Sequence, residues 1–158
     1  MSLRRTPSQT VGPFYSIGLC RRPENELGRA GTELRGTLFD GAGEPVPDGM
    51  IELWDAAGGR WGRCGTDDGG RFAFVVTKPA APDGQAPHLE LLVFARGLLR
   101  HQWTRVYFPD EAEANASDPA LAGLPPGDRA RLVGVQEGNG LRFDVHMQGE
   151  SATVFFAQ

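Results

Sequence analysis

Short runs of alternating hydrophobic and polar residues, separated by turn signals, dominate the pattern of this chain. In one of them Ile51 and Leu53 alternate with Glu52 and Trp54. Side chains two positions apart lie on the same face of a β-strand, so this alternation predicts strands with one buried face. Strands are predicted from alternation, or from a short apolar or aromatic run, at residues 34–39, 50–54, 61–66, 71–77, 89–95, 102–108, 141–147 and 153–156.

Glycine and proline separate these runs, with 22 glycines and 12 prolines spread along the chain. Clusters at residues 40–43, 67–70 and 138–140 are typical of tight turns, so Asp67 and Asp68 are interpreted as turn residues and not as an acid–base pair. Between residues 110 and 132 the composition shifts to alanine, aspartate, glutamate and proline, which predicts short helical turns at 111–115 and 128–132. Many short strands with little helix predict an all-β sandwich or barrel.

Length and charge narrow the class of protein. A chain of 158 residues fits one domain, and a net charge of -4 provides no basic surface for nucleic acid or an anionic membrane. No apolar run approaches the roughly 20 residues that span a bilayer, and the N-terminal arginines precede no apolar signal-peptide core. Cys20 and Cys64 are expected to be free thiols, so we expect a cytoplasmic protein.

The N-terminal segment carries a family resemblance. Residues 6–19 read TPSQTVGPFYSIGL and resemble the opening of the intradiol ring-cleaving dioxygenases. The resemblance continues in order along nearly the whole chain, through residues 51–56, 74–79, 86–90, 93–97, 104–108, 141–145, 148–150 and 153–156. It implies an antiparallel β-sandwich of the intradiol type with short helical segments in the loops. It also implies a sandwich domain at residues 33–158 and an N-terminal arm at residues 1–32 that contacts a partner chain. The loops at 19–33 and 61–66 look shorter than in the family.

Iron-binding members of this family hold Fe³⁺ with two tyrosinates and two histidines, and this chain keeps one of the four positions. Trp61 stands at the first tyrosine position, and an indole cannot replace a phenolate oxygen. No tyrosine follows Pro79, and the two histidine positions hold His88 and Glu90. Tyr107 lies in an aromatic strand and is expected in the core. The resemblance therefore predicts no metal on this chain, with His88 as a packed remnant.

The segments match best the alpha chains of those family members that are built from alpha and beta chains. Such a chain is a subunit of an Fe³⁺-dependent dioxygenase in a hetero-oligomer whose beta chain holds the iron. The implied reaction uses O₂ to cleave a small aromatic substrate, 3,4-dihydroxybenzoate, to 3-carboxy-cis,cis-muconate. No catalytic residue is expected here.

The substrate-binding residues that the resemblance implies are Thr10, Gly12, Pro13 and Arg96. Glycine lets the backbone approach a flat ring, and proline offers an apolar wall. The cation of Arg96 would face an anionic substrate or the partner chain, although a solvated strand end is the alternative. Residues 6–19 are expected to avoid helix, because Pro7, Gly12 and Pro13 disfavour it.

Two other functions stay open at this point. One is a transthyretin-like β-sandwich that binds a small ligand or a protein without catalysis. The other is an independent dioxygenase with an unusual metal site that includes His88 and Glu90.

Overall fold

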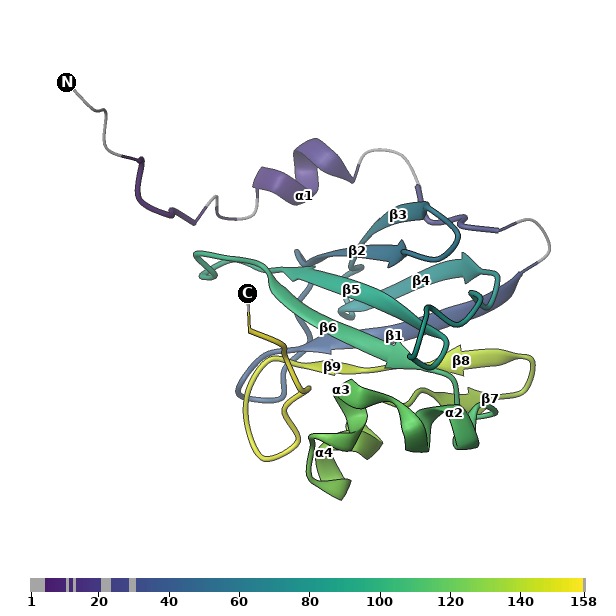
Figure 1. Cartoon of the computed structure of the whole chain (residues 1–158). Coiled ribbons are helices and arrows are strands. Elements are labelled where there is room, and N and C mark those ends of the chain that lie inside the picture. The colour runs from purple at the N-terminus through teal and green to yellow at the C-terminus, as the bar shows by residue number, and fades with distance from the viewer. Residues whose placement is uncertain (1–4, 11, 13, 21–23, 29–30, 158) are drawn as a thin grey trace.

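The computed structural model is a sandwich of two β-sheets, and it describes residues 5–10, 12, 14–20, 24–28 and 31–157 (Figure 1). One sheet has the order β4–β1–β8–β7, with β9 also paired to β1. The other has the order β3–β2–β5–β6. Pairing is antiparallel except that β8 and β9 run parallel to β1. The strands are β1 (Thr32–Phe39), β2 (Met50–Asp55), β3 (Arg60–Gly65), β4 (Arg71–Val76), β5 (His88–Phe94), β6 (Gln102–Tyr107), β7 (Val135–Glu137), β8 (Gly140–Arg142) and β9 (Val145–His146).

The core lies between the facing sides of the two sheets. Buried side chains recur at every second position, as at Leu89, Leu91 and Val93 of β5, which are fully buried. Leu34 and Leu38 of β1, in the other sheet, are buried in the same hydrophobic cluster. In β2 the alternation of Ile51 and Leu53 with Glu52 and Trp54 correctly predicted which face is buried.

Short helices cover a second, smaller cluster of buried residues. These are α2 (Ala112–Ser117), α3 (Pro119–Ala122) and α4 (Pro126–Arg131), which lie together beside β6 and β7 (Figure 1). They enclose Tyr107, Leu121 and Leu132. The helical turns predicted in this region are confirmed, whereas α3 was not predicted. Asp118 begins α3, because its side chain accepts hydrogen bonds from two amides of that helix.

The expectation that residues 6–19 avoid helix is wrong for their second half. Helix α1 spans Phe14–Leu19 and lies outside the two sheets (Figure 1), where Tyr15 and Leu19 line a pocket with Met50 of β2. Pro7 and Gly12 precede this helix, so they do not interrupt its hydrogen bonds. Further along the arm, residues 24 and 26 form bridges to β3 and β4, and Leu27 is buried in the core.

The single strand predicted at residues 141–147 is also wrong, because it divides into β8 and β9. At the break, Phe143 N donates to Arg35 O over 2.8 Å, and the side chain of Asp144 accepts from Thr37 N over 3.0 Å. A Cβ on Gly36 would lie 1.9 Å from Phe143 O, so this glycine permits the close approach. The run at residues 153–156 forms no regular strand either, although Phe156 N donates to Trp103 O.

Candidate functional site

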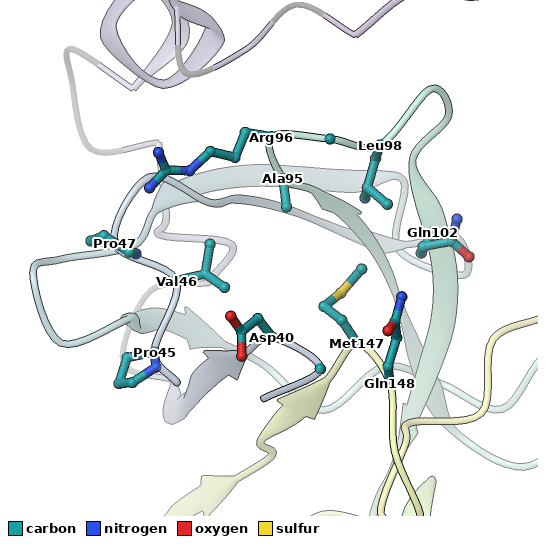
Figure 2. A pocket seen from close by; sticks show the side chains of 12 residues that line it. Asp40, Pro45, Val46, Pro47, Ala95, Arg96, Leu98, Gln102, Met147 and Gln148 are labelled. Atoms are coloured by element: carbon teal, nitrogen blue, oxygen red, sulfur yellow. The ribbon is translucent and has the colours of Figure 1, made fainter. Parts of the chain in front are cut away.

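Arg96 lies in the turn between β5 and β6, at the rim of a pocket at one end of the sandwich (Figure 2). Gly97 follows it with a φ of 85°, a left-handed conformation that glycine adopts without strain. The pocket has a volume of about 570 Å³. Its wall combines the β1–β2 loop, the β5–β6 turn and the segment after β9, with Val46, Leu98 and Met147 as apolar contributors.

The guanidinium of Arg96 forms an ion pair with Asp48, in which Nε and Oδ2 are 3.0 Å apart. The Arg96 side chain is 60% exposed, whereas that of Asp48 is only 16% exposed. In Figure 2 the guanidinium turns toward Pro47 at the rim, away from Met147 and Gln148. The cation is thus presented at the surface and restrained by a more buried carboxylate. A solvated strand end and an arginine that faces a substrate or a partner chain both fit this placement.

A second pocket, of about 460 Å³, lies between the β5–β6 turn and the N-terminal arm. Gln9, Tyr15 and Leu19 of the arm line it. Ala95 and Leu98 of the turn line both pockets. The arm and Arg96 therefore flank the same turn.

The arm residues predicted to bind substrate are only partly described. Thr10 is exposed, and its hydroxyl oxygen accepts from Gly12 N over 3.4 Å. Gly12 has a φ of 63°, and a Cβ placed on it would meet no atom of the described residues within 4 Å, so backbone conformation is what favours glycine there. Pro13 lies outside the described residues. The roles of Thr10, Gly12, Pro13 and Arg96 toward a substrate stay predictions.

Two residues of this region escaped the sequence reasoning. Asp48 stands in a Pro-Asp-Gly turn sequence, which reads as a simple turn. Tyr15 lies in the segment that carries the family resemblance, and the sequence reasoning gave it no role of its own. Only the fold brings both residues into the neighbourhood of Arg96.

The positions that hold iron in other family members make different contacts here. His88 is 5% exposed, and its Nδ1 donates to Ala86 O over 2.8 Å. Its ring lies 5.3 Å from that of Tyr107, which is fully buried. Burial lowers the pKa of His88. The predictions of a packed His88 and a core Tyr107 are confirmed.

Glu90 and Trp61 are also engaged. Glu90 Oε1 lies 3.4 Å from an Arg105 nitrogen, and the two residues face each other across β5 and β6. The Arg63 guanidinium lies 4.7 Å from the centre of the Trp61 ring. Within the part of the chain that the structure describes, no group of three or more His, Cys, Asp or Glu side chains could hold a metal ion. One buried imidazole and one ion-paired carboxylate do not fit a Fe³⁺ site.

The turn prediction at Asp67 is confirmed, because its side chain accepts hydrogen bonds from the amides of Gly69 and Arg71.

Cys20 and Cys64 are free cysteines. None of the helices in the described ranges is long and apolar enough to cross a membrane.

No protein-family model matches this chain. It is 40% identical to the protocatechuate 3,4-dioxygenase alpha chain of Burkholderia cepacia, over 98% of each chain. It is 36% identical to the alpha chain of Pseudomonas putida, over 98% of this chain and 96% of that one. The beta chain of the Burkholderia cepacia enzyme is 31% identical over 75% of this chain and 64% of the relative. The alpha-chain alignments extend over 194 positions, more than the 158 residues here, so those relatives contain segments that this chain lacks.

Solved structures show the same fold. Hydroxyquinol 1,2-dioxygenase from Pseudomonas putida matches with a TM-score of 0.60 at 18% identity, covering 92% of this chain and 67% of that one. An intradiol ring-cleavage dioxygenase from Tetranychus urticae also reaches 0.60, at 13% identity, covering 90% and 93%. Together with the identity to the alpha chains over nearly the full length, these findings show that the chain belongs to the intradiol ring-cleaving dioxygenase family.

Proposed function

We propose that this chain is the alpha subunit of a protocatechuate 3,4-dioxygenase and pairs with an iron-bearing beta chain. The observation that carries the proposal is the 40% identity to an alpha chain over 98% of both sequences. The family cleaves catechol rings with the help of iron, and the described residues of this chain include no set of ligands that fits Fe³⁺. The iron of the assembled enzyme is therefore assigned to the beta chain. A transthyretin-like binding module gains no support from these relatives, which are ring-cleaving enzymes.

Arg96 is the residue of this chain best suited to a benzoate substrate. Protocatechuate has a carboxylate on its ring, and a guanidinium binds carboxylates through charge-assisted hydrogen bonds. The side chain is 60% exposed at the pocket rim, where a partner chain can cover it. Because Asp48 contacts Nε, the terminal nitrogens still offer N–H groups to an anion.

The N-terminal arm makes the second contribution of this chain to the proposed substrate pocket. Thr10, Gly12 and Pro13 precede α1, and α1 sits beside the turn that carries Arg96. On this proposal they form one wall of the substrate pocket, exclude water and orient the ring. O₂ and the flat aromatic substrate both reach the site between the two chains.

Exposed apolar residues near the arm support pairing with another chain. Phe14 and Ile17, one helical turn apart on α1, are 74% and 62% exposed. Leu99 in the β5–β6 turn is 61% exposed. Large apolar side chains that stay exposed on the arm and on the nearby turn are surfaces that a partner chain can cover. The proposed enzyme works in the cytoplasm, where Cys20 and Cys64 stay reduced.

The test is co-expression with a beta chain that has all four iron ligands. The purified complex should consume O₂ and protocatechuate in equal amounts and form 3-carboxy-cis,cis-muconate, whereas either chain alone should be far less active. The control is the same beta chain co-expressed with an unrelated β-sandwich protein. Failure of the two chains to co-purify, or full activity of the beta chain alone, would refute the proposal.

A further inference from the structure

Asp48 is the most unusual charged residue near the candidate site. It lies just before β2, and its side chain is 16% exposed. Oδ2 contacts Arg96 Nε at 3.0 Å, while Oδ1 is buried and has no hydrogen-bond partner among the described residues. A buried carboxylate oxygen without a partner is unfavourable, so this atom should be matched by a donor.

Tyr15 provides a complementary group. Its hydroxyl is also buried without a hydrogen-bond partner in the described ranges. The pKa of Tyr15 is raised to about 12, first by burial and then by the negative charge of Asp48, while Arg96 acts in the opposite direction. Tyr15 lines the second pocket together with Ala95, the residue before Arg96, so the phenol lies beside the turn that carries the Asp48–Arg96 ion pair. A phenol donates where a carboxylate accepts. Because no direct hydrogen bond joins the two atoms, one bridging water can satisfy both of them.

We propose that Asp48 is a positioning residue that joins Tyr15 of the arm to Arg96 of the β5–β6 turn. Through this connection, one carboxylate fixes the relative placement of the two parts of the chain that border the substrate. The inference rests on the proposed function, since it assigns Asp48 a task in presenting Arg96 to the substrate carboxylate.

The geometry explains why a carboxylate is useful there. An arginine held at Nε keeps its planar end directed outward, and less side-chain freedom is lost when an anion then binds. The negative charge of Asp48 also weakens the attraction of Arg96 for an anion, so the expected benefit is orientation and not added charge. The described residues give Asp48 no other hydrogen bond or ion pair, which leaves it without a separate structural task.

The test compares Asp48→Ala, Arg96→Ala and the double variant in the assembled complex, with protocatechuate and with catechol as substrates. Asp48→Ala should lower kcat/KM for protocatechuate by about 5- to 30-fold, and catechol, which has no carboxylate, should be affected much less. The double variant should be no worse than Arg96→Ala, because Asp48 acts through Arg96. Asp48→Asn should recover part of the loss, since its amide oxygen can still accept from Arg96 Nε, while its amino group takes the place of the other carboxylate oxygen. Asp68→Ala is the matched control, because Asp68 is an exposed turn carboxylate.

Three results would overturn the assignment of Asp48: equal losses for both substrates, additive losses in the double variant, or an unchanged Asp48→Ala enzyme when Arg96→Ala is impaired. An unmodified complex without activity would instead refute the proposed function. The link to Tyr15 is then still tested on the chain alone, by hydrogen exchange of the α1 amides. Asp48→Ala and Tyr15→Phe should both speed that exchange relative to Asp68→Ala, and unchanged exchange in both would also overturn the inference.

Discussion

Asp118 should be among the most sensitive positions for the stability of this chain. Its side chain is 1% exposed, and its two oxygens accept four hydrogen bonds. The donors are the amides of Ala86, Ala120 and Leu121 and the hydroxyl of Tyr107, at 2.8, 2.8, 3.2 and 3.3 Å in that order. Replacing Asp118 with alanine removes a helix N-cap and leaves buried donors without an acceptor.

The magnitude follows from these contacts. Loss of an N-cap costs about 1 kcal/mol. Each buried donor left unsatisfied costs about 1–3 kcal/mol, and Ala86 N and the Tyr107 hydroxyl lie in the interior. Because the contacts share one side chain and are not additive, we expect Asp118→Ala to lower the free energy of unfolding by about 3–5 kcal/mol. Asp118→Asn should fall between the unmodified chain and Asp118→Ala, since its amide oxygen can keep the Oδ1 contacts while its amino group faces the Ala86 amide.

Urea unfolding followed by tryptophan fluorescence measures this change. The midpoint should fall for both variants while the m-value stays constant. Asp68→Ala, an exposed turn variant, should change the free energy of unfolding by less than about 0.5 kcal/mol. A loss below about 1 kcal/mol for Asp118→Ala would show that solvent replaces the missing carboxylate. It would refute the prediction that the hydrogen bonds of Asp118 contribute strongly to the free energy of unfolding.

Three further predictions concern the proposed enzyme. The chain purified alone should contain essentially no iron by elemental analysis, and near-stoichiometric iron that His88→Ala removes would contradict the assigned division between subunits. In the complex, Arg96→Ala should reduce kcat/KM for protocatechuate about 10- to 150-fold, because a charge-assisted hydrogen bond contributes about 1.5–3 kcal/mol. Lysine should restore part of this activity, and Arg100→Ala, an exposed arginine in the same turn, should leave it nearly unchanged. Serine at both Phe14 and Ile17 should weaken binding to the beta chain more than about tenfold without lowering the Tm of the isolated chain, because both side chains are exposed before pairing; unchanged affinity would exclude α1 from the interface.

The sequence by itself determined the fold class and the burial of most strands. The alternation of Ile51 and Leu53 with Glu52 and Trp54 places the two apolar residues on an inward face, because alternate side chains of a strand point to opposite sides. The order of the matching segments also predicted the family correctly. Turns with a strong local signal, such as Asp67 with its glycines, could be predicted for the same reason: their hydrogen bonds lie within a few residues.

Tertiary structure decided the features that depend on distant segments. The strand at 141–147 breaks because Phe143 and Asp144 hydrogen bond to β1, more than a hundred residues away. Helix α1 forms although its sequence carries few helical signals. The ion pair of Asp48 with Arg96 and the place of Tyr15 beside the same turn follow from strand pairing and loop placement, which no local pattern encodes. Local periodicity specifies the faces of strands, whereas the contacts of a site are made between residues that only the folded chain brings together.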